Sequence, residues 1–118
     1  MYTTIRYAAD FLFEKNEANL TRDDIVRVSP LLDVSKRSSL FRGWEAIVIV
    51  GHADPKERDS LALSKRRAMA VRQLMEQFGV SPSVISSEGI GGRQPIGASD
   101  ARNRRVEVEL LGKCGVPA

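Results

Sequence analysis

The chain has 118 residues, of which 42% are hydrophobic and 28% charged, and these values are typical of one globular domain with a single core. The formal net charge of +3 is small, and positive and negative residues are interleaved, which argues against a disordered chain and against a dedicated nucleic-acid-binding surface. One cysteine and one histidine, Cys114 and His52, give little support to an internal disulfide or a zinc site. No segment has the roughly 18 apolar residues of a membrane span, and the N-terminus lacks the pattern of a secretory signal.

Two elements are predicted in the first third of the chain. Residues 4–13 alternate in a way that predicts a strand, with these large side chains on one face: Ile5, Tyr7, Phe11 and Phe13. Thr21 and Asp24 have the spacing of a capping box, which predicts a helix from about 22 to 35. Pro30 is expected to kink or divide this helix.

The middle of the chain carries the clearest pattern. Residues 45–50 are a β-branched apolar run, which predicts a central strand in a sheet covered by helices. The strongest helix prediction covers residues 60–78, with Asp59 or Ser60 as its cap. Gly79 fits the left-handed position that ends a helix.

The last third is predicted to contain a strand at 84–88, a loop at 89–103 and a strand at 106–110. Residues 112–118 are expected to form a flexible tail in which Cys114 is a bystander thiol or takes part in an intermolecular disulfide. Strands separated by helices favour parallel crossovers in a layered α/β sandwich, with the final strand inserted antiparallel. We therefore expect one domain, 1–118, with a core of about 4–111.

The predicted helix at 60–78 contains one cation on its apolar side. At about 100° per residue, Arg67 falls one turn after Leu63 and one turn before Val71. A guanidinium near a core needs a partner or water. Asp54 lies in the loop just past the central strand, where open α/β sheets bind ligands. Two interpretations stay open: an ion pair of Asp54 with Arg67, or a cleft in which the two charges hold a zwitterionic ligand.

Several segments together resemble one family, the OmpA-like C-terminal domain. They are GHAD at 51–54, LSKRRAMAV at 63–71, GIGGRQP at 89–95 and NRRVEVEL at 103–110. LFEKNEANL at 12–20 resembles the family's first strand and turn, so the resemblance covers about residues 10–111. The family includes the peptidoglycan-associated lipoprotein and the periplasmic parts of motor stators. The resemblance implies a two-layer α/β sandwich with a mixed sheet, in the order strand-helix-strand-helix-strand-strand.

The resemblance also implies a function. Domains of this family bind peptidoglycan non-covalently in the periplasm, without catalysis, and so anchor an envelope protein or assembly to the cell wall. In the family, the aspartate after the second strand and the second arginine of the RRA motif bind the diaminopimelate of the stem peptide. This implies that Asp54 binds the ammonium end and Arg67 the carboxylate.

Further family positions map onto a wider set of residues: Ala53, Leu63, Ser64, Asn16, and Arg104 or Arg105. For Leu63 a plain packing role on the buried helix face is the stronger interpretation. For the two arginines, solvation or cross-strand pairing competes with ligand contact. No cofactor and no metal is implied, and further partners are other envelope proteins or a second copy of the chain.

The loop after Asp54 departs from the family pattern. The family usually has DxxG there and YN before LS, whereas this chain has DPKERDSLALS, two residues shorter and without a glycine. Asp59 and Ser60 stand where the tyrosine and asparagine are expected. An alternative hypothesis therefore stays open: a protein-interaction or oligomerisation domain that keeps the fold but has lost wall binding.

Other chemistry has little support in the sequence. A metal site built from His52, Asp54 and Asp59 would draw all its ligands from one short stretch. No nucleophile with an adjacent base indicates a wall hydrolase. The glycines at 89, 91 and 92 match neither a dinucleotide-binding nor a P-loop motif. We expect no enzyme activity.

Overall fold

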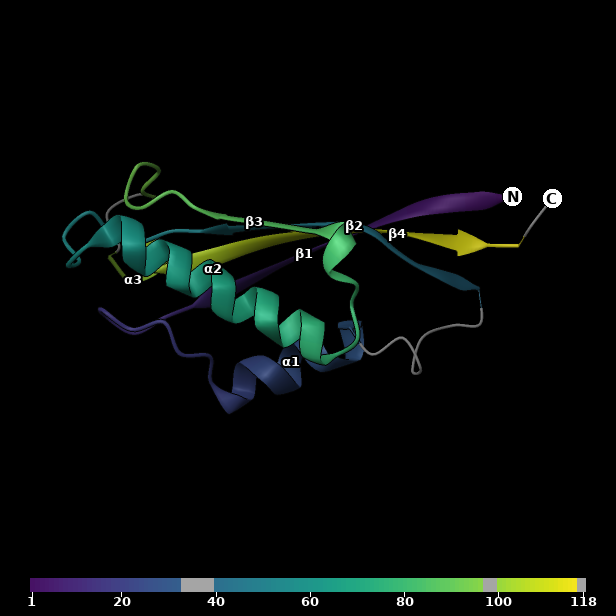
Figure 1. Cartoon of the computed structure of the whole chain (residues 1–118), viewed down its shortest axis with the longest axis horizontal. Coiled ribbons are helices and arrows are strands. Elements are labelled where there is room, and N and C mark those ends of the chain that lie inside the picture. The colour runs from purple at the N-terminus through teal and green to yellow at the C-terminus, as the bar shows by residue number, and fades with distance from the viewer. Residues whose placement is uncertain (33–39, 97–99, 117–118) are drawn as a thin grey trace.

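The computed structural model describes residues 1–32, 40–96 and 100–116. A sheet with the strand order β1-β4-β2-β3 forms one layer, and α1 and α2 lie on one of its faces as the second layer (Figure 1). The predicted two-layer α/β sandwich with a mixed sheet is confirmed. The elements are β1 (Tyr2–Leu12), α1 (Arg22–Leu32), β2 (Phe41–Gly51), α2 (Ser60–Gln77), the 3-10 turn η2 (Pro82–Val84), β3 (Ile85–Gly89), α3 (Asp100–Asn103) and β4 (Arg105–Gly115).

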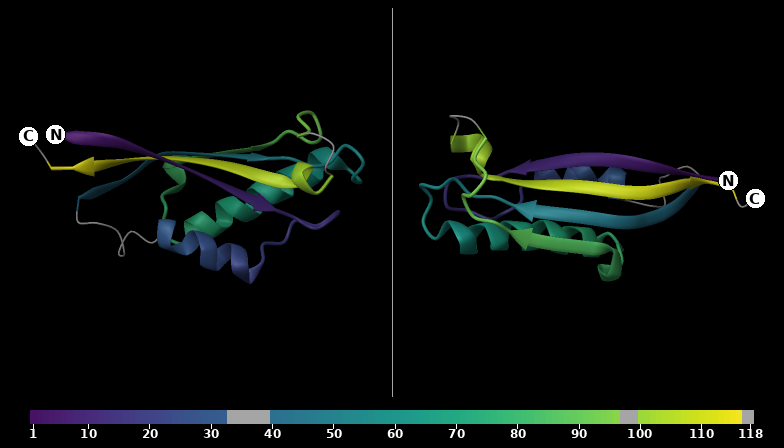
Figure 2. Two further views of the ribbon diagram at one scale, coloured as in Figure 1. Left: turned by 180° about the vertical axis from the view of Figure 1, so that it is seen from behind. Right: turned by 90° about the horizontal axis from the view of Figure 1, so that it is seen from above.

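The last strand in the chain lies inside the sheet. β4 runs antiparallel to both β1 and β2, and β2 pairs in parallel with β3 (Figure 2). Parallel pairing follows from the crossover through α2. Gly51, the last residue of β2, pairs with Gly89 of β3 and with Val106 near the start of β4. The loops after β2 and β3 therefore meet at one end of the molecule, the end opposite the N-terminus (Figure 1).

The core lies between the sheet and the two longer helices. Buried apolar side chains come from every layer, and the main ones are Phe11, Val28, Leu32, Ile47, Ile49, Val71, Leu74, Met75, Val106, Val108 and Leu110. None of the described helices lies over the other face of the sheet, where Val48 is 41% exposed. The prediction of a sheet covered by helices therefore holds for one face, and apolar residues of β2 on the other face contact solvent.

The helix ends follow local chemistry in two of three cases. Thr21 and Asp24 form the reciprocal capping box, with backbone N–H to side-chain oxygen distances of 3.0 and 3.1 Å. Gly79 has the expected positive φ of 87° after α2. Asp59 stands at the N-cap of α2 but makes no side-chain capping hydrogen bond, because its backbone is left-handed, with φ 49°. Pro30 lies inside α1, which continues to Leu32; the predicted extension to residue 35 falls outside the described residues.

Several predicted elements were too short, and one helix was not predicted. β1 begins at Tyr2 and β2 at Phe41, and the short helix α3 lies in the segment expected to be loop. The predicted tail is wrong for residues 112–115, which extend β4 because they pair with β1 and β2. Cys114 is half-buried in this strand. Residues 117 and 118 of the predicted tail lie outside the described residues.

Two glycines let α2 approach the carboxyl ends of the parallel strands. A Cβ atom on Gly51 would lie 2.1 Å from the carbonyl oxygen of Ser64, and one on Gly89 would lie 2.4 Å from the amide nitrogen of Lys65. Only a residue without a side chain allows such contact between helix and strand backbones. This contact places the second turn of α2, which carries Arg67, against the end of β2.

We predict that Gly51→Ala destabilises the domain, because α2 and β2 have to separate to admit the methyl group. The expected loss in the free energy of unfolding is about 1–3 kcal/mol, measured by urea denaturation. Val48→Ala, on the exposed face of the same strand, serves as the control and should change stability by less than about 1 kcal/mol. Wild-type stability of Gly51→Ala would contradict the close approach of α2.

Candidate functional site

The residues singled out by the sequence gather at the end of the molecule where α2 begins. The loop 52–59 follows β2, the turn 13–20 follows β1, and the segment from 90 to α3 follows β3. Asp54 is 3% exposed and Arg67 is fully buried. The structure brings both residues into one region, but it encloses them and pairs each with another residue.

Arg67 is bound by a different carboxylate from the one expected. Its Nη1 and Nη2 atoms donate to the two oxygens of Glu57 at 2.8 and 2.6 Å, a bidentate ion pair. The remaining N–H groups donate to the backbone carbonyl oxygens of Glu17, His52 and Glu14 at 2.8, 3.1 and 3.2 Å. A guanidinium has five N–H donors, and all of them have an acceptor here. The hypothesis of a direct Asp54–Arg67 ion pair is wrong, because the guanidinium is paired with the Glu57 carboxylate instead.

The carboxylate of Glu57 is the centre of this arrangement. Besides the two bonds from Arg67, it accepts hydrogen bonds from the backbone amides of Asp54 at 2.9 Å and Asn16 at 2.7 Å. Burial alone raises the pKa of Glu57, but the hydrogen bonds from Arg67, Asn16 and Asp54 outweigh burial and hold the pKa below its ordinary value. The side chain is thus an ionised carboxylate held by a guanidinium and two amides.

Asp54 contacts the Glu57 carboxylate through its backbone amide, while its own carboxylate is bonded elsewhere. Its oxygens accept hydrogen bonds from the side-chain amide of Asn103 at 2.8 Å and from the backbone amide of Lys56 at 2.9 Å. The Asn103 bond is the main reason that the pKa of Asp54 is lowered; burial opposes the shift, and the Lys56 amide adds to it. Asp54 and Arg67 therefore flank the Glu57 carboxylate, the first through its backbone amide and the second through its side chain.

The neighbouring family positions hold the loops together. Ser64 donates from Oγ to the carbonyl of Leu61 at 2.7 Å and accepts from the amide of Gly91 at 2.8 Å, which ties α2 to the loop after β3. Ala53 is buried, and its amide donates to the carbonyl of Gly91 at 3.0 Å. Leu63 is a buried residue of α2, as expected from its place on the helix. Ligand contact by Ala53 and Ser64 stays a prediction.

Asn16 has a clearer structural role. It adopts a left-handed backbone with φ 61°, a conformation that asparagine tolerates better than most residues. Its side-chain oxygen accepts from the amide of Arg58 at 3.1 Å, and its own amide donates to Glu57. Asn16 therefore connects the turn after β1 to the loop after β2. A role in ligand binding stays a prediction.

The two arginines of NRRVE make bonds elsewhere. Arg104 donates from Nε to the carbonyl of Phe13 at 2.8 Å. Arg105 is buried, donates from Nη2 to the carbonyl of Gln94 at 3.1 Å, and lies 3.5 Å from a carboxylate oxygen of Glu107. The competing interpretation, pairing within the sheet, describes Arg105 well, and ligand contact by it stays a prediction.

Sequence reasoning missed two residues of the site, Glu57 and Asn103. Glu57 stands in a run of alternating charges, DPKERD, which indicates a solvated loop. A usable signal was its position three residues after Asp54, where the family's DxxG pattern has glycine. Asn103 opens the motif NRRVE, which pointed only to the arginines after it.

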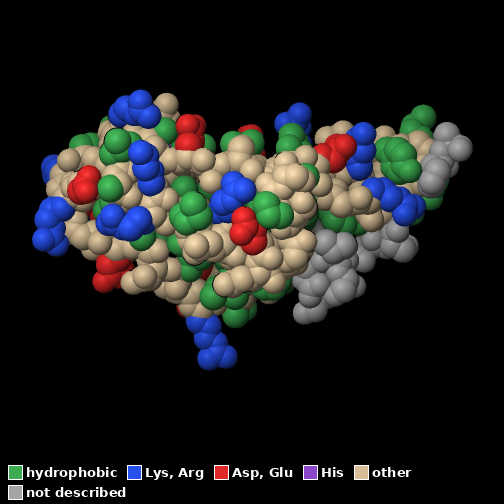
Figure 3. All heavy atoms as spheres, viewed as in Figure 1, with side chains coloured by type: hydrophobic (Ala, Val, Ile, Leu, Met, Phe, Trp, Pro, Cys, Tyr) green, Lys and Arg blue, Asp and Glu red, His purple; other side chains and the backbone are tan. Residues whose placement is uncertain are grey.

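The surface around this end carries exposed cations. Figure 3 shows lysine and arginine side chains gathered at the end of the molecule where α2 begins. Exposed members from this part of the chain are Lys56, Arg58, Lys65, Arg66, Arg93 and Arg102. Such a rim attracts anionic groups, an effect that salt screens.

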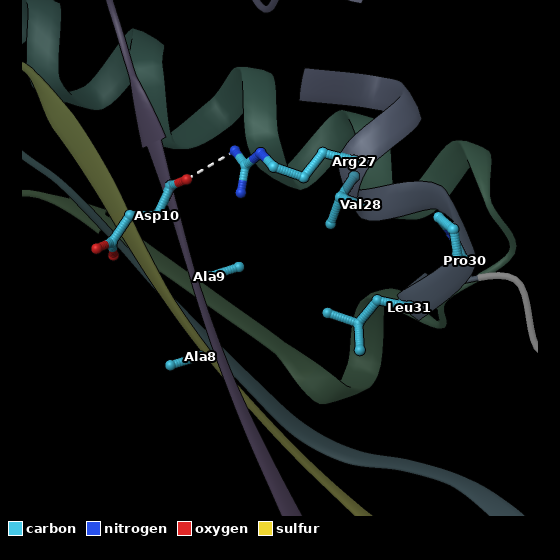
Figure 4. A pocket seen from close by; sticks show the side chains of 7 residues that line it. All are labelled: Ala8, Ala9, Asp10, Arg27, Val28, Pro30 and Leu31. Atoms are coloured by element: carbon cyan, nitrogen blue, oxygen red, sulfur yellow. Dashed lines mark hydrogen bonds between the residues drawn. The ribbon is translucent and has the colours of Figure 1, made fainter. Parts of the chain in front are cut away.

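A separate hollow of about 600 Å³ lies between β1 and α1 (Figure 4). Arg27 donates across it to the backbone carbonyl of Asp10 at 2.7 Å, and the carboxylate of Asp10 points away from the hollow (Figure 4). The other lining residues are apolar: Ala8, Ala9, Val28, Pro30 and Leu31. This hollow lacks the opposed pair of charges that a zwitterionic ligand requires.

Among residues 1–32, 40–96 and 100–116, no cluster of three or more histidine, cysteine, aspartate or glutamate side chains has the arrangement of a metal site. Within the same ranges, no helix is long and apolar enough to span a bilayer.

Comparison with known proteins agrees with this architecture. The model of the OmpA family matches residues 12–109, and the chain therefore belongs to the OmpA family. It is 31% identical to outer membrane protein A of Bordetella avium over 95% of its own length and 59% of that protein. It is 30% identical to the peptidoglycan-associated lipoprotein of Pseudomonas aeruginosa over 89% of its length and 64% of that protein. The chain thus spans less than two thirds of these relatives.

Solved structures share the fold. The OmpA-like domain of FopA1 from Francisella tularensis superposes with a TM-score of 0.76 at 23% identity, covering 99% of this chain and 82% of that one. The peptidoglycan-associated lipoprotein of Burkholderia pseudomallei superposes with a TM-score of 0.70 at 21% identity, covering 86% and 88%. At these sequence identities, the structural similarity shows that this chain shares the fold of those proteins.

Truncation of the buried arginine should be costly. We predict that Arg67→Ala lowers the free energy of unfolding by about 3–5 kcal/mol, because the Glu57 carboxylate is left buried without its partner. Arg66→Ala, one residue away and exposed, should stay within about 0.5 kcal/mol of wild type. The comparison is made by urea denaturation, and similar losses for the two variants would contradict the buried ion pair.

Acid should destabilise the domain in two steps. The pKa of His52 is lowered from 6.5, mainly by burial and further by Arg105, against the opposing effect of Glu107. The unfolded chain then binds a proton that the folded chain does not, so stability falls as the pH drops from about 7 to about 5. Asp54 and Glu57 also have lowered pKa values, so their contribution is lost at still lower pH, below about 4.5.

Urea unfolding midpoints measured from about pH 7 to about pH 3 test this dependence. His52→Asn should flatten the upper step and leave the lower one. A wild-type midpoint that rises on acidification through the upper range would have the wrong sign.

Proposed function

We propose that this domain binds peptidoglycan non-covalently, by recognising the diaminopimelate of the stem peptide at Asp54 and Arg67. The observation that carries the proposal is the Glu57 carboxylate held between these two residues. A bidentate guanidinium and two backbone amides are a carboxylate-binding site, here filled from within the chain. We propose that an amino-acid carboxylate takes that place and that its ammonium group pairs with the Asp54 carboxylate.

The comparisons and the surface support the same ligand class. One relative is named for its association with peptidoglycan. Stem peptides carry free carboxylates, which the exposed lysines and arginines around the site would attract. These features favour a wall polymer over a small neutral ligand.

The role that follows is anchoring rather than catalysis. We place the domain in the periplasm as part of a membrane-attached envelope protein, where it holds that protein or its assembly to the wall. Other envelope proteins, or a second copy of the chain, are further candidate partners.

Sedimentation with purified sacculi tests the proposal. Wild type should pellet with the sacculi, and Asp54→Asn and Arg67→Lys should each bind about tenfold or more weakly, since a lost charge-assisted hydrogen bond is worth about 1.4 kcal/mol or more. Arg66→Lys is the matched control on the same helix. Circular dichroism establishes that each variant is folded. Wild-type pelleting by both site variants would show that the site is not the binding site.

A second candidate function is favoured by the closure of the site. Every N–H group of Arg67 is already bonded within the chain, which suits an OmpA-like protein-interaction or oligomerisation domain that no longer binds the wall. Folded wild type that stays in the supernatant but self-associates, measured by analytical ultracentrifugation, would favour this function.

A further inference from the structure

A ligand carboxylate cannot reach Arg67 while Glu57 is in place. The Glu57 side chain is 2% exposed, that of Arg67 is fully buried, and the shorter bond between them is 2.6 Å. Both oxygens of Glu57 are bonded to the guanidinium, and each also accepts a backbone amide. The donors that a ligand carboxylate would use are therefore the same donors that Glu57 now uses.

We propose that Glu57 is an internal competitor that occupies the carboxylate subsite, and that a stem peptide binds only by displacing it. This inference rests on the proposed function, since it concerns the affinity and selectivity of that same site. Glu57 is thereby a specificity-determining residue, because an incoming ligand has to replace its carboxylate and also make at least one further favourable interaction with the site.

The loop that carries Glu57 is built to let this side chain leave. Among residues 55–59, Glu57 is the buried one, and Pro55, Lys56, Arg58 and Asp59 are exposed. Outward movement of the loop therefore exposes little apolar surface. Asp59, at the far end of the loop, has a left-handed backbone with φ 49°, a conformation that disfavours a residue with a side chain. Opening breaks the bonds to the Glu57 carboxylate and the bond from the amide of Arg58 to Asn16.

The competition also predicts which ligands succeed. A plain carboxylate gains no more from Arg67 and the two amides than Glu57 already does, and Glu57 has the advantage of being tethered. An α-amino acid adds an ammonium group, which can pair with the carboxylate of Asp54 once the loop has moved. The site should therefore select zwitterionic amino-acid ends and reject simple carboxylates.

Calorimetric titration with meso-diaminopimelate tests the displacement. Glu57→Gly removes the competitor and restores the glycine of the family's DxxG pattern, and it should bind diaminopimelate about tenfold or more tightly than wild type, because the closed state no longer reduces the apparent affinity. Glu57→Gln keeps the shape but not the charge, so its affinity should rise in the same direction. If Glu57→Gly does not fold, Glu57→Gln carries the test.

Two controls isolate the carboxylate. Arg58→Gly introduces the same backbone freedom one residue further along the loop and removes one cation of the rim, so it should bind no more tightly than wild type. Pimelate, which has the two carboxylates of diaminopimelate without the ammonium groups, should bind Glu57→Gly more weakly than diaminopimelate does.

The outcomes separate the two proposals. If wild type and the folded Glu57 variants bind diaminopimelate equally well and all are retained on sacculi, the displacement proposal is contradicted. The proposal that the domain binds the wall then still stands. Failure of every folded protein to bind either diaminopimelate or sacculi overturns the proposed function, and the displacement with it. Tighter binding of diaminopimelate by Glu57→Gly, with no gain in affinity for Arg58→Gly, supports both proposals.

Discussion

A buried guanidinium organises this end of the molecule. An unpaired charge inside a protein is costly, so the chain around Arg67 is arranged to supply acceptors. The turn after β1 contributes the carbonyls of Glu14 and Glu17, and the loop after β2 contributes the carbonyl of His52 and the Glu57 carboxylate. Two segments that are far apart in the sequence are thus held to one side chain of α2. Both the stability of these loops and the chemistry of the site depend on that one interaction.

The sheet topology makes the interaction possible. Insertion of β4 between β1 and β2 places the turn after β1 near the carboxyl end of β2, and Gly51 and Gly89 let the start of α2 come close to both parallel strands. The same glycines set the depth at which Arg67 enters.

The sequence correctly predicted the features that depend on residues close together in the chain. The periodicity of residues 60–78 identified α2 and the position of Arg67 on its apolar side, and Thr21 with Asp24 identified the start of α1. The lengths of β1, β2 and β4 were underestimated, because their outer ends are stabilised by pairing with distant strands rather than by their own pattern. The partner of Arg67 was not predicted, because the alternating charges of DPKERD indicate a solvated loop, and only the position of Glu57 at the glycine of the family's DxxG pattern distinguishes it from the carboxylates that contact water.

The central claim is that Glu57 holds the Arg67 guanidinium in the free protein. Nitrogen-15 NMR of the arginine side chains tests it most directly, since a guanidinium whose donors are all bonded and buried neither rotates freely nor exchanges its protons quickly with water. We expect Arg67 to show separate, slowly exchanging Nη signals in wild type, and these signals should collapse in Glu57→Gln. A single averaged, fast-exchanging Arg67 signal in wild type, like that of an exposed arginine, would contradict the account.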